Sequence, residues 1–319
     1  MKAAVLHELG KAPRFEDFAE PSAAKDETLV RVRAASLKAV DRQLASGSHY
    51  ASPRELPIVG GTDGVGELED GTRVFFGGPR RPYGAMAERT VAPRAFCFSV
   101  PAGVDDVTAA ALPNPGISAW LSLTQRAKLA PGETVLILGA TGVTGQLAVQ
   151  IAKLLGAKRV IAAGRNQRVI GRLRELGADA TIQIDQAGDA LKDAFAHEAT
   201  DRGFDVVIDY LWGRPTEALL AAITKPEFAV VTRETRLVQV GESAGPTISL
   251  PAAVLRSTAL TILGTAGIPP REVLADAMQQ VMTRAARGEL RIETNRIALA
   301  DIESAWLHPE SGRRIVVIP

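Results

Sequence analysis

Residues 134–146 read TVLILGATGVTGQ, and this stretch decides the fold. An apolar strand runs into Gly139, Gly142 and Gly145, and a helical pattern of apolar positions follows directly. Glycines at this spacing allow a tight turn, a close approach of the backbone to a pyrophosphate, and close packing of helix on strand. Ala140 stands at the first position of a strict G-x-G-x-x-G, so the match is the A-x-G-x-x-G variant. We therefore expect a dinucleotide to bind at this turn.

The start of the following helix offers unpaired backbone N–H groups and a partial positive charge to a phosphate. The competing interpretation is an ordinary strand-to-helix turn with packing glycines. On the first interpretation, the residues that contact the cofactor here are Gly139, Ala140, Thr141, Gly142, Val143 and Thr144.

The next strand indicates which dinucleotide is bound. A site for NAD usually carries Asp or Glu about 20 residues beyond the glycines, where it binds the adenosine ribose. Residues 160–174 contain no carboxylate, and Gly164 and Arg165 occupy the expected place. Arg165, with Arg168 one turn further on, can grip a 2′-phosphate bidentately. The alternative is two solvated arginines at a helix start, and the pattern favours NADPH.

Buried apolar strands alternate with helical segments around this turn. The predicted strands cover 135–138, 159–163, 181–184, 205–209 and 237–241, and the predicted helices 145–155, 166–176 and about 187–200. Such alternation predicts an α/β fold, a doubly wound parallel sheet of the Rossmann type with helices on both faces.

The two ends of the chain have a different pattern. Residues 28–35 alternate apolar and polar side chains as a half-buried strand does, and glycine and proline turns cut the segments that follow. The chain ends with a predicted helix near 270–287 and a strand at 314–318. We expect a mainly antiparallel β domain from residues 1–113 and 257–319, with the dinucleotide-binding domain, 114–256, inserted into it.

Composition excludes several classes of function. Lys and Arg number 37 against 36 Asp and Glu, and this balance gives no electrostatic reason to expect a nucleic-acid partner. No run approaches the 18 or more apolar residues of a membrane span, and the first apolar stretch is too short for a signal peptide. The single cysteine, Cys97, allows no internal disulfide, so we expect a cytoplasmic protein.

Several further segments occur in a characteristic order: GGTDGVG (60–66), LEDGTRVFFGG (68–78), AAALPNPGISAWLSL (109–123) and GRRIVVIP (312–319). With the glycine turn, they make the chain resemble the medium-chain dehydrogenase/reductase superfamily, in its zinc-independent quinone oxidoreductase-like branch. The resemblance implies that the β domain is a GroES-like catalytic domain and that the active-site cleft lies between the domains. It also implies a homodimer formed through the edge strand at 258–264.

The resemblance bears on zinc as well. Zinc-containing relatives place a Cys in the segment equivalent to 36–41 and a His before the residue equivalent to Asp63, whereas this chain has Lys38 and Thr62 there. Without that Lewis acid, alcohol oxidation is poorly supported. An NADPH site can still deliver hydride to an acceptor that is already electrophilic, such as a quinone or an α,β-unsaturated carbonyl compound.

The catalytic candidates come from the same resemblance. Tyr50 stands where relatives often carry a tyrosine facing the nicotinamide, and a phenol can donate a proton to a developing oxyanion. His49 competes for this place, and a surface tyrosine is the plain alternative. Asp41 matches the family's N-P-x-D segment, whereas Lys38 replaces its Asn. Lys38 either binds a substrate oxygen or points to solvent.

Further cofactor residues follow from strand ends and from the relatives. Gly241, Glu242 and Ser243 end a strand at the carboxyl edge of the sheet, where ligands bind in open α/β folds. Ser118 matches a hydroxyl residue that contacts the nicotinamide end in relatives, although it also suits a helix N-cap. Thr265 lies in the loop that relatives use near the carboxamide.

Two other functions remain open at this point. An enoyl thioester (enoyl-CoA) reductase uses similar chemistry but needs a basic docking surface, which the sequence does not clearly show. A non-catalytic NADPH-binding sensor belongs to another class, and its output would not depend on a proton donor such as Tyr50. The leading interpretation is an NADPH-dependent reductase of a small quinone or enone, with neither nucleic acid nor membrane as a partner.

Overall fold

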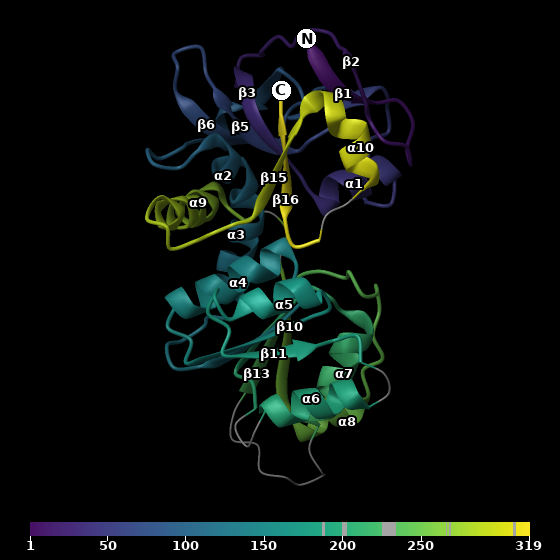
Figure 1. The fold of residues 1–319 in the computed structure, drawn as a ribbon, viewed down its shortest axis with the longest axis vertical. Coiled ribbons are helices and arrows are strands. Elements are labelled where there is room, and N and C mark those ends of the chain that lie inside the picture. The colour runs from purple at the N-terminus through teal and green to yellow at the C-terminus, as the bar shows by residue number, and fades with distance from the viewer. Residues whose placement is uncertain (187–188, 200–202, 225–233, 266, 268, 309–310) are drawn as a thin grey trace. The chain divides into compact units, whose positions relative to one another are not determined.

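The computed structural model describes residues 1–319 except 187–188, 200–202, 225–233, 266, 268 and 309–310. The chain divides into two compact units, each with its own sheet and core (Figure 1). Unit 1 comprises Met1–Asn114 and Arg271–Pro319, and unit 2 comprises Pro115–Pro270.

Unit 2 contains a parallel sheet whose strands follow the order β11-β10-β9-β12-β13-β14 across the described residues. The strands are β9 (Thr134–Leu138), β10 (Arg159–Gly164), β11 (Ala180–Gln183), β12 (Val206–Asp209), β13 (Glu234–Gln239) and β14 (Ala259–Gly264). The helices are α3 (Pro113–Leu121, at the unit boundary), α4 (Val143–Leu154), α5 (Gln167–Leu173), α6 (Ala190–Ala199), α7 (Gly213–Ile223) and α8 (Ala252–Ser257). This strand order is that of a Rossmann fold, as expected from the sequence.

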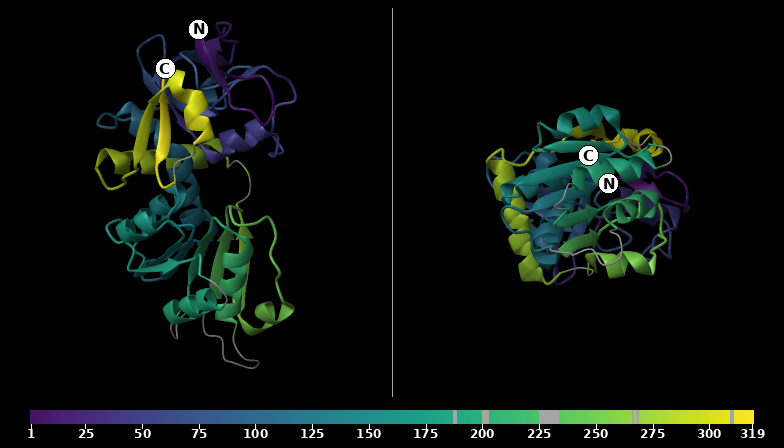
Figure 2. Two further views of the ribbon diagram at one scale, coloured as in Figure 1. Left: turned by 45° about the vertical axis from the view of Figure 1, so that its right-hand side comes forward. Right: turned by 90° about the horizontal axis from the view of Figure 1, so that it is seen from below.

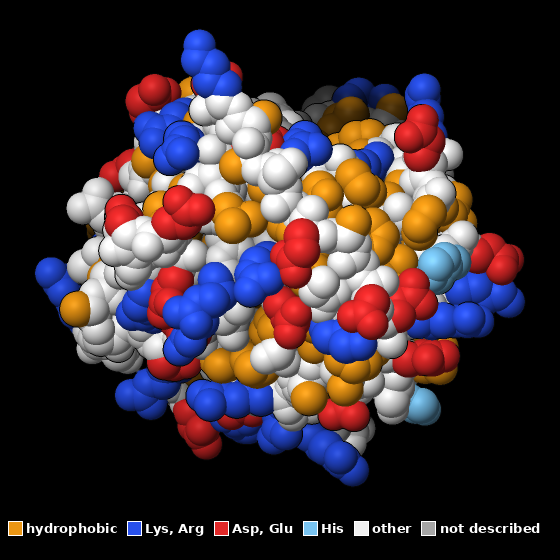
Figure 3. Space-filling view, turned by 90° about the horizontal axis from the view of Figure 1, so that it is seen from above, with side chains coloured by type: hydrophobic (Ala, Val, Ile, Leu, Met, Phe, Trp, Pro, Cys, Tyr) orange, Lys and Arg blue, Asp and Glu red, His pale blue; other side chains and the backbone are white. Residues whose placement is uncertain are grey.

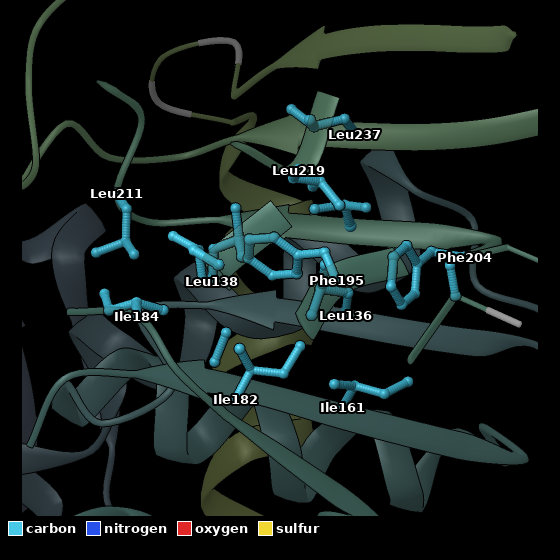
Figure 4. Packing of buried hydrophobic residues seen from close by; sticks show 14 residues of the cluster. Leu136, Leu138, Ile161, Ile182, Ile184, Phe195, Phe204, Leu211, Leu219 and Leu237 are labelled. Carbon is cyan, nitrogen blue, oxygen red and sulfur yellow. The ribbon is translucent and has the colours of Figure 1, made fainter. Parts of the chain in front are cut away.

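The core of unit 2 explains why its strands could be recognised. Leu136 and Leu138 of β9 are fully buried and pack with Phe195 of α6 and Leu219 of α7 on one face of the sheet (Figure 4). Ile137, between them in sequence, is also fully buried on the opposite face. A strand covered on both faces reads as a continuous apolar run.

The parallel sheet extends further along the chain than the sequence analysis assigned to it. Residues 259–264, placed by the sequence with the β domain that resumes at 257, form β14 and pair in parallel with β13 from Glu234↔Ala259 to Gln239↔Gly264. The second unit accordingly runs to Pro270. The short segment TALTILG gave no sign of which sheet it joins, because periodicity does not identify a strand's partner.

Unit 1 is mainly antiparallel. Its strands are β1 (Lys2–Leu6), β2 (Arg14–Asp17), β3 (Glu27–Leu37), β4 (Ile58–Val59), β5 (Asp63–Glu67), β6 (Arg73–Gly77), β7 (Arg89–Pro93), β8 (Cys97–Ser99), β15 (Thr294–Ala298) and β16 (Arg314–Ile318). Its helices are α1 (Ala39–Ser46), α2 (Asp106–Ala111), α9 (Arg271–Ala286) and α10 (Ile302–Leu307). In the described residues the sheets run β2-β1-β4 and β15-β16-β3-β5-β6-β8, with β7 also paired to β3.

Strand β3 organises unit 1. It pairs antiparallel with β5, β7 and β16, and its inward side chains Val30, Val32 and Leu37 are buried in the core. Strands β15 and β16 form the parallel pair of this unit (Figure 2). The end of β3 leads directly into α1, and this corner holds the charged residues described below.

Charge on the surface is mixed. On the face drawn in Figure 3, Lys and Arg side chains are interspersed with Asp and Glu. Within the described ranges, the search for a helix long and apolar enough to cross a membrane finds none.

Candidate functional site

The glycine turn of unit 2 closes tightly because three of its positions leave no room for a side chain. Gly139 has φ +87°, in the left-handed region that favours glycine. A Cβ at Gly145 would lie 2.3 Å from the carbonyl oxygen of Gly139, and one at Gly164 would lie 2.4 Å from Cγ2 of Thr141. The first helical residues therefore pack against the backbone of the turn, and the end of β10 packs against the side chain of Thr141.

The same turn leaves donors available for an anion. The N–H groups of Gly139 and Ala140 donate to the carbonyl of Ala163 at 2.9 and 2.8 Å, which fixes the turn against β10. Helix α4 begins at Val143 without a side-chain cap in the described structure, so the N–H groups of Val143 and Thr144 have no helical partner. Phosphate oxygens suit such donors.

Arg165 lies directly after β10, and Arg168 lies in the first turn of α5, as the sequence indicates. Asn166 caps α5 and accepts the N–H of Arg168 at 3.1 Å, so this corner is ordered by its own backbone. Both arginine side chains are exposed, and neither has an ion-pair partner in the part of the chain that the structure describes. They are free to bind an added phosphate, and their role stays a prediction.

The other predicted cofactor residues lie at three places in unit 2. Ser243 donates to the carbonyl of Tyr210 at 3.0 Å, and Glu242 beside it is exposed. Thr265 is exposed after β14. Ser118 is half-buried as the sixth residue of α3, so the alternative of an N-cap is wrong for it. These cofactor assignments stay predictions.

The corner between β3 and α1 in unit 1 holds a buried ion cluster. Lys38, the residue before α1, is only 2% exposed. Its ammonium donates to Asp63 Oδ1 at 2.8 Å and to the carbonyl of Ser36 at 3.0 Å, and lies 3.3 Å from Asp41 Oδ2. The expectation that Lys38 points to solvent is therefore wrong. Its contact with a substrate oxygen stays a prediction.

Asp41 links this cluster to the neighbouring loop. Its Oδ2 accepts the backbone N–H of Lys38 at 2.8 Å, and its Oδ1 accepts both the N–H and the hydroxyl of Thr62 at 3.1 Å. Burial raises the pKa of Asp63, whereas Lys38 beside it opposes that rise. The half-buried Arg314 is a second cation whose charge lowers the pKa of Asp63, and burial lowers the pKa of Arg314 itself.

A pocket of about 180 Å³ lies beside the cluster within unit 1. Asp41 and Thr62 line one part of it, and Leu44, Ile58 and Val59 are among its apolar lining residues. The pocket combines an apolar wall with a few polar groups, as sites for small organic ligands do. No local sequence pattern indicates this pocket, because its lining comes from segments far apart in the chain.

Tyr50 and His49 lie on an exposed loop. Tyr50 is 97% exposed, and its ring stacks at 4.2 Å on that of His49. The Nδ1 of His49 accepts the N–H of Ala51 at 3.1 Å. The structure does not bring Tyr50 together with Lys38 and Asp41, and its role as proton donor stays a prediction.

Two members of the ion cluster, Asp63 and Arg314, could not be predicted from the sequence. Asp41, in the first turn of α1, accepts the N–H of Lys38 as the acidic residue of a capping box does, and this local signal links the two residues. Asp63 and Arg314 join the cluster through strands β5 and β16, and no local pattern in the sequence reveals those contacts.

Comparison with known proteins agrees with this architecture. The family described as Zinc-binding dehydrogenase matches residues 143–283. A quinone oxidoreductase-like protein 2 homolog from Nematostella vectensis is 28% identical over 265 residues, covering 80% of this chain and 69% of that protein. An NADPH-dependent alkenal/one oxidoreductase from Arabidopsis thaliana is 29% identical over 240 residues, covering 66% of this chain and 59% of that protein.

Solved structures are similar over the whole chain. The quinone oxidoreductase from Thermus thermophilus, also solved with NADPH, has a TM-score of 0.81 at 28% identity, with 100% of both chains covered. The Escherichia coli quinone oxidoreductase has a TM-score of 0.86 over 100% of both chains, and at 20% identity this likeness concerns the fold.

The Rossmann sheet and glycine turn of unit 2 and the antiparallel sheet of unit 1 resemble the medium-chain dehydrogenase/reductase superfamily. Within that superfamily, the resemblance to the quinone oxidoreductase-like branch is confirmed.

The residues present do not fit the zinc that the matching family's name mentions. Lys38 stands at one ligand position of zinc-containing relatives, and its ammonium has no lone pair to offer a metal. Thr62, at the other position, donates its hydroxyl to Asp41. Over the described ranges, no three His, Cys, Asp or Glu side chains gather as a metal site.

Proposed function

We propose that this protein is an NADPH-dependent, zinc-independent oxidoreductase that transfers hydride to a quinone or to an activated alkene such as an α,β-unsaturated ketone. The observation that carries the proposal is the glycine turn, whose helix start has free N–H donors. The next strand, β10, is followed by Arg165 and Arg168, with no carboxylate between residues 160 and 174. Relatives named as quinone and alkenal/one oxidoreductases support the same conclusion.

NADPH, when bound, supplies the hydride. The N–H groups of Val143 and Thr144 bind its pyrophosphate, and Arg165 and Arg168 bind its 2′-phosphate. The acceptor binds beside Asp41 and Thr62, where the apolar pocket wall excludes water. A proton then reaches the reduced acceptor from Tyr50, with His49 or water as the alternative sources.

The test is the loss of absorbance of the reduced nicotinamide when the purified protein meets quinones, enones and enoyl-CoA esters. We expect quinones or enones to be reduced, and NADPH to be used much faster than NADH. Reduction of enoyl-CoA alone would establish the enoyl thioester reductase instead. Binding of NADPH without turnover by any acceptor would establish a sensor and refute the enzyme.

We also propose a cytoplasmic homodimer formed through β14. This strand is the edge of the described parallel sheet, and its sequence ALTILG is largely apolar. An apolar edge strand pairs readily with another chain. Light scattering after size-exclusion chromatography should give twice the mass of the chain, and a charged substitution at Ile262 should give the monomer.

A further inference from the structure

Tyr210 lies beside the glycine turn on the neighbouring strand. Asp209, the last residue of β12, pairs with Leu138, the last residue of β9, so Tyr210 and Gly139 follow side by side. A Cβ at Gly139 would lie 3.1 Å from the Cβ of Tyr210. The carboxylate of Asp209, the residue before Tyr210, accepts the hydroxyl of Thr216 in α7 at 2.5 Å.

The main chain of Tyr210 is fully engaged. Its N–H donates to the carbonyl of Leu138 at 3.1 Å, and its carbonyl accepts the hydroxyl of Ser243 at 3.0 Å. A Cβ at Gly241 would lie 2.8 Å from that carbonyl oxygen, so glycine is required there. These contacts fix the position of Tyr210 independently of its side chain.

The hydroxyl of Tyr210 has no such partner. The residue as a whole is half-buried, but its hydroxyl oxygen is buried and makes no hydrogen bond within the described structure. Burial raises the pKa of Tyr210, so the phenol keeps its proton and acts as a donor. Buried donors without an acceptor are rare in native proteins and often mark a place where a ligand or water binds.

We propose that Tyr210 positions the cofactor, its hydroxyl donating a hydrogen bond to an oxygen of the bound dinucleotide. This inference rests on the proposed NADPH site. A dinucleotide offers acceptor oxygens on its phosphates, riboses and carboxamide, and Tyr210 stands next to the turn that holds it. Phenylalanine would pack equally well in the free protein, so the hydroxyl has a role only when the cofactor is bound.

The test compares Tyr210→Phe with Tyr83→Phe in the full-length protein. Tyr83, in unit 1, already donates its hydroxyl to the carbonyl of Glu20 at 3.2 Å, so it provides the same substitution at a satisfied site. Two quantities are measured: the dissociation constant of NADPH by fluorescence titration, and the thermal midpoint of the cofactor-free protein. Titration with 2′,5′-ADP, which lacks the nicotinamide half, locates the contact.

We expect Tyr210→Phe to weaken NADPH binding about tenfold while leaving the cofactor-free midpoint unchanged or higher, because an unsatisfied buried donor has been removed. Tyr83→Phe should leave NADPH affinity unchanged and lower the midpoint slightly. A loss seen with NADPH alone places the contact on the nicotinamide half, and a loss with both ligands places it on the adenosine half.

Unchanged affinity of Tyr210→Phe for both ligands would overturn the inference. A lower midpoint together with unchanged affinity would assign the hydroxyl a purely structural role and overturn it too. Failure of the unmodified protein to bind NADPH is a different result, since it refutes the proposed function itself.

Discussion

Replacement of Lys38 by Met removes the buried ammonium and keeps most of the side chain's volume. Two carboxylates, with side chains 9% exposed at Asp63 and 1% exposed at Asp41, then lose their cation. At 2.8 Å and an effective dielectric constant of about 20, the gross attraction to Asp63 is about 6 kcal/mol. The net loss of folding free energy is smaller, about 3–5 kcal/mol, because burying the pair already costs desolvation energy. This loss is the cost of leaving a buried carboxylate without its cation.

Urea unfolding measures this loss. Trp306 lies in unit 1, so its fluorescence reports that unit in a background where Trp120 and Trp212 are replaced by Phe. With a urea slope of about 2–3 kcal/mol/M, we expect the midpoint to fall by about 1–2.5 M. Lys2→Met is the matched control: its ammonium lies 2.9 Å from Asp17 but is 45% exposed, so the midpoint should not move.

The pH dependence gives a second readout of the same cluster. Burial raises the folded pKa of Asp63 above its unfolded value, and removal of Lys38 takes away the largest influence that opposes that rise. The stability contribution of such a carboxyl is present below its unfolded pKa and is lost as the pH rises through the folded pKa. The loss of unfolding free energy in Lys38→Met, relative to the unmodified protein, should therefore be larger at about pH 8 than at about pH 5.

Addition of Asp63→Asn to Lys38→Met should recover part of the lost stability, because it removes one stranded charge. Two results would refute the reasoning. One is a Lys38→Met midpoint equal to that of the unmodified protein. The other is a deficit that stays the same across this pH range.

Three further predictions concern unit 2. Arg165→Asp should lower the ratio of kcat/KM for NADPH to that for NADH by about 10- to 100-fold. An unchanged ratio would show that Arg165 does not bind the 2′-phosphate. Gly145→Ala should abolish NADPH binding and cost about 1–3 kcal/mol in urea unfolding, because its Cβ meets turn backbone. Gly171→Ala in α5, where a Cβ meets nothing within 4 Å, should instead stabilise the protein by about 0.5–1 kcal/mol. Burial raises the pKa of Asp209, so stability relative to Asp209→Asn should fall as the pH rises from about 4 to 7; parallel curves for the two proteins would contradict this.

The parallel sheet could be predicted because its central strands β9, β10 and β12 are buried on both faces. Residues 135–138 and 206–208 are unbroken apolar runs, and they lie in β9 and β12. Helix α7 was not predicted, since Gly213 and Pro215 at its start resemble a turn, although proline suits the first turn of a helix. The predicted helix at about 187–200 corresponds to α6 over Ala190–Ala199, and residues 187, 188 and 200 lie outside the described ones.

The cofactor half of the candidate site could be predicted better than the other half. A glycine turn is a local pattern, and its strand and helix lie within a short stretch of chain. The ion cluster instead joins Lys38 to Asp63 across β3 and β5 and brings Arg314 from near the end of the chain. The unpartnered hydroxyl of Tyr210 is a property of three-dimensional packing, and no residue pattern encodes it.

The geometry of Lys38 also limits the chemistry that unit 1 can perform. An ammonium has three protons, and four oxygens surround this one: those of Asp63 and Asp41, and the carbonyl and hydroxyl of Ser36. In this arrangement the ammonium protons face protein oxygens, so the predicted contact of Lys38 with a substrate oxygen requires one of these partners to be given up. Thr62 likewise commits its hydroxyl to Asp41. Since these groups supply little electrophilic assistance, the acceptor must itself be electron-poor, and quinones and conjugated enones meet that requirement whereas simple ketones do not.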